Sequence, residues 1–126
     1  CQGWRDDPLY GNVESVTFTE YSLKDSSGVL SRSKIEEKYC YNFNQSGDVT
    51  ELADYNSDGS LWYKYIYKYD TKGNMTEAST YNSDGSLSRK YIYKYDAQGN
   101  ITEMTEYYGE MQKPRRQDVY TIIYRK

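Results

Sequence analysis

The sequence contains no histidine, and it has only two cysteines and two prolines among its 126 residues. Without histidine, the usual general base and the commonest transition-metal ligand are absent. Cys40 occupies the position that isoleucine holds in two later repeats, and no evident partner would activate its thiol. We therefore interpret Cys40 as a small buried hydrophobe, and we predict no enzymatic activity, no cofactor and no metal site.

Long hydrophobic runs are also missing, and no stretch approaches the ~20 apolar residues of a membrane span. The net charge of −3 does not favour a nucleic-acid partner. Five basic residues near the C-terminus are a local exception, which we interpret as a solvated end: Lys113, Arg115, Arg116, Arg125 and Lys126. An apolar content of 37% can accompany disorder, but the seventeen tyrosines can bury their rings while their hydroxyls stay hydrogen-bonded. The sequence predicts a thin, aromatic core.

An internal repeat organises the chain. The segment Tyr67–Glu77 returns 26 residues later as Tyr93–Glu103, and a degenerate copy, Tyr41–Glu51, lies 26 residues earlier. A period of this length, with two turn signals in each copy, is typical of one β-hairpin per repeat.

Two kinds of turn alternate along the repeats. Asp70–Gly73 and Asp96–Gly99 carry Asp first and Gly fourth, and Asn56–Gly59 and Asn82–Gly85 have the same form. This pattern suits a type I turn followed by a residue with positive φ, which makes a three-residue hairpin loop with a bulge. The sequence therefore predicts an all-β fold: an antiparallel meander of about eight strands in four ~26-residue hairpin repeats, forming a single twisted, curled sheet.

Whether this sheet stays open or closes partly into a barrel is left undecided by the sequence. We expect the domain to cover residues 11–126, after a polar tether at residues 1–10. The regular strands are expected near residues 49–55, 62–69, 75–81, 88–95 and 101–108. The last strand is expected at Asp118–Tyr124.

The turn type also predicts a strand register. If Asp70 faces Asn74, then Tyr69 lies opposite Met75, and across the next turn Met75 lies opposite Tyr93. One face should then hold Tyr63, Tyr65, Tyr67, Tyr69, Met75, Tyr81, Leu87, Tyr91, Tyr93 and Tyr95, and the carboxylates Glu51, Glu77 and Glu103 should join it. The other should hold Lys64, Lys68, Thr76, Thr80, Lys90 and Lys94, around a stripe of Ile66, Ala78 and Ile92.

Two patterns could carry other chemistry. The segment Asp54–Leu61 matches the start of a calcium loop, but Tyr65 stands where the bidentate Glu belongs, and hairpin turns explain the same residues. Glu77 and Glu103 could form the carboxylate pair of a glycosidase. Because they recur once per hairpin, we interpret them as structural partners of neighbouring side chains.

The motif Tyr-Asp-x-x-Gly-Asn occurs at Tyr69–Asn74 and Tyr95–Asn100. It resembles the core of the YD repeat found in Rhs-type proteins, and the resemblance extends over about residues 11–126, with two clean copies. Large members of that family wind many hairpins into a hollow shell around a cargo. Four hairpins are too few for such a shell, so the resemblance implies the hairpin alone. The chain most resembles small YD-like bacterial lipoproteins of uncharacterised function.

The N-terminus carries a second resemblance. The chain begins with Cys1 followed by the polar segment Gln2–Asp7, as mature bacterial lipoproteins do. The resemblance implies lipid attachment at Cys1, a location in the cell envelope at the outer membrane or cell surface, and membrane contact through that anchor alone. The alternative is that Cys1 is an arbitrary starting point. A disulfide between Cys1 and Cys40 would conflict with lipidation, and we do not expect it.

The tyrosine-rich face is the main candidate for function. Tyrosine rings on a sheet can stack on sugars or contact a partner protein. We predict a non-enzymatic binding module for a glycan or a cell-surface protein, with the site residues Tyr65, Tyr67, Tyr91 and Tyr93. The alternative is a structural spacer whose tyrosines are buried as a core or as an interface between copies, through the sheet face or the edge strands. A glycosidase-like enzyme is the third interpretation.

Overall fold

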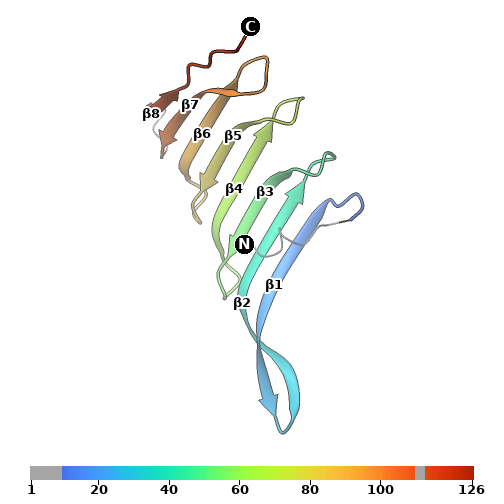
Figure 1. The fold of residues 1–126 in the computed structure, drawn as a ribbon. Helices are drawn as coiled ribbons and strands as arrows, with labels where there is room; N and C mark the ends of the chain where they lie inside the picture. Colours follow the sequence, from blue (N-terminus) through green and yellow to red (C-terminus); the bar gives the residue numbers. More distant parts are fainter. Residues whose placement is uncertain (1–9, 110–112) are drawn as a thin grey trace. The chain divides into compact units, whose positions relative to one another are not determined.

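The computed structural model describes residues 10–109 and 113–126, which form eight antiparallel β-strands and no helix (Figure 1). The strands follow one another in sequence order in a single meander, as predicted. They are β1 (Ser15–Ser26), β2 (Val29–Phe43), β3 (Val49–Tyr55), β4 (Leu61–Tyr69), β5 (Met75–Tyr81), β6 (Leu87–Tyr95), β7 (Ile101–Tyr108) and β8 (Pro114–Val119). Among these strands β1 and β8 end the order without pairing with each other, so the sheet is not closed into a barrel.

The last strand was predicted in the wrong place. β8 covers Pro114–Val119, and only its final two residues overlap the predicted strand Asp118–Tyr124. The residues after β8 still follow β7, because the amide of Tyr120 donates to the carbonyl of Thr102 at 2.9 Å. Beyond that point the Tyr124 hydroxyl bonds to a turn carboxylate, so a side-chain contact replaces the strand ladder.

The chain divides into two compact units, Cys1–Lys64 (unit 1) and Tyr65–Lys126 (unit 2), and the boundary falls inside β4. Unit 1 holds β1 to β3 and the start of β4, and unit 2 holds the remainder. Within each unit, the described strands contact only their neighbours in the sheet. The prediction of a single domain over residues 11–126 stays a prediction, as does the tether, of which only Tyr10 is described.

The predicted three-residue hairpin loop is confirmed. In the turn Asp70–Asn74, the Asp70 amide donates to the Asn74 carbonyl at 2.8 Å, and the Gly73 amide donates to the Asp70 carbonyl at 3.1 Å. Gly73 has φ +88°, a left-handed backbone conformation that residues with a Cβ atom rarely adopt. One Asp70 carboxylate oxygen accepts the amides of Lys72 and Asn74, and these hydrogen bonds lower the pKa of the carboxyl group.

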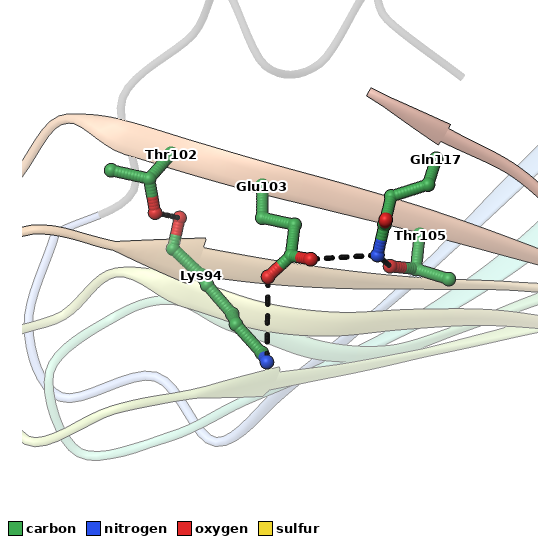
Figure 2. Close-up of polar contacts among 5 residues, drawn as sticks. All are labelled: Lys94, Thr102, Glu103, Thr105 and Gln117. Atoms are coloured by element: carbon green, nitrogen blue, oxygen red, sulfur yellow. Dashed lines mark hydrogen bonds and ion pairs between the residues drawn. The ribbon is translucent and has the colours of Figure 1, made fainter. Parts of the chain in front are cut away.

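A β-bulge follows the turn in three hairpins, which join β2 to β3, β5 to β6 and β6 to β7. The pair Tyr95–Ile101 is followed by Lys94–Glu103, so Thr102 has no partner residue in the ladder. Thr50 is left over in the same way between β2 and β3. Each threonine hydroxyl donates at 3.3 Å to the carbonyl across the strand, as Figure 2 shows for Thr102 and Lys94. The threonine of the repeat thus occupies and stabilises the bulge.

The bulges overturn part of the predicted register. Beyond the bulge at Ser88, Glu77 lies opposite Ile92 and Ala78 lies opposite Tyr91, so the predicted pairing of Met75 with Tyr93 is wrong. A shift of one residue moves every following side chain to the other face. Ala78 therefore shares the face of the tyrosines. Glu51, Glu77 and Glu103, which were predicted on that face, lie on the opposite face with the lysines.

The core is thin and partly aromatic, as expected of a chain with few aliphatic residues. Tyr41 is fully buried, and it lies opposite Val16 on one side and Leu52 on the other. Cys40 is only half-buried, with Thr17 and Ala53 as its cross-strand neighbours. Its surroundings agree with a packing role, although its burial is less complete than predicted.

Replacing Gly73 or Gly99 with valine should lower the free energy of unfolding by about 1 kcal/mol or more, because a β-branched residue resists positive φ. A Cβ atom added at either glycine would meet no atom within 4 Å beyond the adjacent residues of the chain, so the penalty would come from the backbone conformation and not from a clash with the rest of the fold. Chemical denaturation would measure it. Ala97→Val, in the same turn as Gly99, is the matched control and should change the midpoint little. Equal midpoints for all three variants would contradict the turn assignment.

Candidate functional site

The candidate site is the tyrosine face of unit 2, which comprises Tyr65, Tyr67 and Tyr69 of β4 and Tyr91, Tyr93 and Tyr95 of β6. Side chains alternate between the two faces of a strand. Lys68 of β4 and Lys90 of β6 both bind Glu77 of β5, at 3.1 Å each, so these lysines share one face. The odd-numbered tyrosines of both strands therefore share the other face.

Small side chains separate the two rows of tyrosines. In the sheet order β5 lies between β4 and β6, and its Ala78 is opposite Tyr91. Neighbouring strands are about 4.8 Å apart, so the two rows should lie about 10 Å from each other. On the far side of β6, Met104 of β7 lies opposite Tyr93. The face thus alternates aromatic and smaller or flexible side chains from strand to strand.

All six tyrosines of this face are half-buried. The rings of Tyr91 and Tyr93 are stacked, with centroids 6.3 Å apart and planes 19° from parallel. Burial raises the pKa of the Tyr93 hydroxyl, and the fields of Tyr91, Tyr95 and Tyr67 add to the effect. The Tyr93 hydroxyl therefore stays protonated at neutral pH and can donate a hydrogen bond beside an apolar ring surface.

Tyr95, the tyrosine of the Tyr-Asp-x-x-Gly-Asn motif, has a structural role. Its hydroxyl donates to the carbonyl of Met75 at 2.6 Å, which ties β6 to the start of the preceding strand. Burial, and then the charge of Asp70, raises the pKa of Tyr95. An open recess of about 430 Å³ lies beside this contact, between the turns Asp70–Asn74 and Asp96–Asn100, and Tyr93 and Thr76 contribute to its lining.

An arginine cluster at the other end of the face was missed by sequence reasoning. The Arg89 guanidinium donates to the Tyr91 hydroxyl at 3.2 Å and lies 3.5 Å from the Glu106 carboxylate. Arg89 and Arg115 both lie over the ring of Tyr108, at 5.4 and 4.8 Å from its centroid. Arg89 lies two residues before Tyr91 on the same strand, and this spacing alone could have placed its side chain on the tyrosine face. Arg115 was not predictable, because it is the extra residue of a bulge in β8.

The lysine face carries a network of ion pairs and hydrogen bonds. Lys94 and Glu103 form an ion pair at 3.4 Å, and the Gln117 amide donates to Glu103 at 2.6 Å and to Thr105 at 3.0 Å (Figure 2). Glu77 binds two lysines on the same face. Glu77 and Glu103, the pair considered for glycosidase chemistry, thus have cationic partners from neighbouring strands and face away from the tyrosines.

The segment resembling a calcium loop forms a hairpin turn. An Asp58 carboxylate oxygen accepts the Ser60 hydroxyl at 2.6 Å and the Ser60 amide at 2.9 Å, and these bonds lower the pKa of Asp58. Within residues 10–109 and 113–126, no group of three or more His, Cys, Asp or Glu side chains could hold a metal ion.

The structure brings the four predicted site residues, Tyr65, Tyr67, Tyr91 and Tyr93, onto one face of unit 2. The predicted lipid attachment site, Cys1, lies outside the described residues. In the part of the chain that the structure covers, no helix is long and apolar enough to cross a membrane.

No family model matches the chain, and no curated protein matches it. The resemblance to YD-repeat lipoproteins therefore stays a prediction that depends on the sequence motifs.

Replacing Glu77 with glutamine should lower the free energy of unfolding at neutral pH by up to about 1 kcal/mol, the range of partly exposed ion pairs. Burial alone would raise the pKa of Glu77, but hydrogen bonds and charge from Lys68 and Lys90 outweigh it and lower this pKa. The stabilisation is therefore present above the unfolded-state pKa, about 4.3, and is lost as the pH falls through the folded-state value.

Thermal unfolding of wild type and Glu77→Gln across this pH range would measure the effect. The difference between the two proteins should shrink on acidification. Glu36→Gln is the control, because Glu36 pairs with the exposed Lys34 at 3.6 Å and the loss of such an exposed pair should matter little at any pH. A difference for Glu77→Gln that does not change with pH would contradict the ion-pair interpretation.

Proposed function

We propose that this chain is a non-enzymatic binding module of the bacterial cell envelope, and that it binds a glycan on the tyrosine face of unit 2. The observation that carries the proposal is the pair of half-buried tyrosine rows on β4 and β6, with Ala78 between them. Such a surface offers flat rings for the apolar faces of sugars and hydroxyls for their polar edges.

The single-layer construction of the unit supports this proposal. The described strands of unit 2 contact only their sheet neighbours, so none of them packs over the tyrosine face. Tyrosine has only two rotatable side-chain torsions, so a half-buried row of tyrosine rings loses little conformational entropy on binding. A partner protein that uses the same face is the second candidate, because aromatic residues are also enriched at protein interfaces.

The spacer alternative is supported by one contact, the bond from Tyr95 to the Met75 carbonyl. That bond gives Tyr95 a role within the sheet, and Tyr41 has one as the most buried side chain. For Tyr67, Tyr91 and Tyr93, which remain half-exposed, binding and packing roles predict different mutant behaviour. Attachment to the envelope through a lipid on Cys1 belongs to the same proposal and depends on the lipoprotein resemblance.

Titration of the protein with a panel of bacterial and host polysaccharides, followed by Tyr/Trp fluorescence, tests the proposal. A saturable change is expected with at least one polysaccharide. Tyr67→Ala or Tyr93→Ala should weaken this binding about fivefold or more, if a sugar stacks on the ring as a nucleobase does, with about 1–3 kcal/mol for each contact. Lys94→Ala, on the opposite face of β6, is the control and should bind as wild type does.

Each variant should first be shown to be folded by far-UV circular dichroism and thermal unfolding. No response across the panel would overturn glycan binding. Loss of folding in both alanine variants, with no binding by the wild type, would favour the spacer.

A further inference from the structure

The two edge strands of the sheet differ in how they are protected from pairing with another chain. β8 has only six residues, begins with Pro114, and carries the bulged Arg115. Short length, proline, bulges and charged side chains all discourage edge pairing. The segment after β8 continues along β7, where the Tyr124 hydroxyl accepts from Asn100 at 2.9 Å and donates to Asp96. This edge is therefore blocked.

β1 lacks these protective features over Ser15–Glu20. It contains no proline there, its pairing with β2 is regular, and its only charged residue is Glu20. The Phe43 amide donates to the Glu14 carbonyl at 2.9 Å, so Glu14 lies in a hydrogen-bonded pair with β2. Because such pairs alternate along an antiparallel ladder, the backbone groups of Ser15, Thr17 and Thr19 point away from β2. No other described strand pairs with that side of β1.

We infer that β1 is a dimerisation edge, and that it pairs antiparallel with β1 of a second copy of this chain. The segment is self-complementary about Phe18. With Phe18 opposite Phe18 of the second copy, Thr17 lies opposite the second copy's Thr19, and the outward N–H and C=O groups of both threonines find partners. Aromatic pairs and Thr–Thr pairs across strands are both favourable.

Charge disfavours one of the two neighbouring registers, the one centred on Thr17. A register shifted by two residues would place Glu14 opposite Glu20 of the second copy, and the two-fold symmetry would repeat this contact. Like charges directly opposite each other destabilise a strand pair. In the register centred on Phe18, Glu20 lies opposite Val16 instead. A two-fold interface of this kind closes on itself, and the blocked edge at β8 then limits the assembly to a dimer.

Size-exclusion chromatography with light scattering, over a series of protein concentrations, tests the inference. The wild type should shift from monomer to dimer as its concentration rises. Thr17→Pro should remain monomeric, because it removes an outward N–H and leaves the hydrogen bonds to β2 intact. Thr17→Ala keeps the N–H and should still dimerise. A wild type that is monomeric throughout, or a dimer that persists in Thr17→Pro, would overturn the inference.

Cysteine cross-linking provides a second test that does not depend on the folding of the proline variant. Phe18 would lie in a non-hydrogen-bonded pair, where the two Cα atoms are about 4.5 Å apart and a disulfide can form. In a background with Cys1→Ser and Cys40→Ala, Phe18→Cys should give a covalent dimer under mild oxidation. Val16→Cys, which would face Glu20, is the control and should cross-link poorly. Equal cross-linking at both positions, or none at Phe18, would contradict the register.

Discussion

The hairpin turn with its bulge is the constraint on which the sheet depends. In the turns that begin at Asn44, Asp70 and Asp96, the first side chain accepts the amides that follow it, and a glycine at positive φ closes the loop. Three residues after this glycine the ladder gains an extra residue, which is Thr50 in β3 and Thr102 in β7. Because side chains alternate along a strand, this extra residue decides which face receives the glutamates and which receives the tyrosines.

The bulges determine which side chains each face of unit 2 carries. On one face, glutamates on β5 and β7 bind lysines on neighbouring strands and hold the sheet with polar contacts. The other face carries the tyrosines of β4 and β6, the small side chain of Ala78, and the ion pair of Arg89 with Glu106. Few side chains are fully buried in the described residues, so cross-strand pairs contribute more to stability than an interior core does.

Much of the fold could be predicted from the sequence, because the repeat, the turn residues and the alternation are all local signals. The strands from β3 to β7 and the positive φ of the turn glycines were predicted in this way. The faces of Glu77 and Ala78 were not, because an irregularity of one residue after the turn reverses the parity of all that follows. β8 was misplaced because Tyr120–Tyr124 looks like a strand, whereas Pro114 and the two arginines after it do not. Of the candidate site, the four tyrosines were predicted to share a face, and the arginines around Tyr108 were missed.

Contacts restricted to neighbouring strands also determine how each unit folds and opens. A strand that touches only the one before and the one after it gains its stability from those two interfaces, as in other linear repeat proteins. Contacts between residues close in sequence can form with a small loss of chain entropy, so hairpins can form early and then extend the sheet one strand at a time. The outer strand of each unit can therefore open locally while the strands with two neighbours stay paired. Amide hydrogen exchange should slow progressively from the outer strand toward those inner strands.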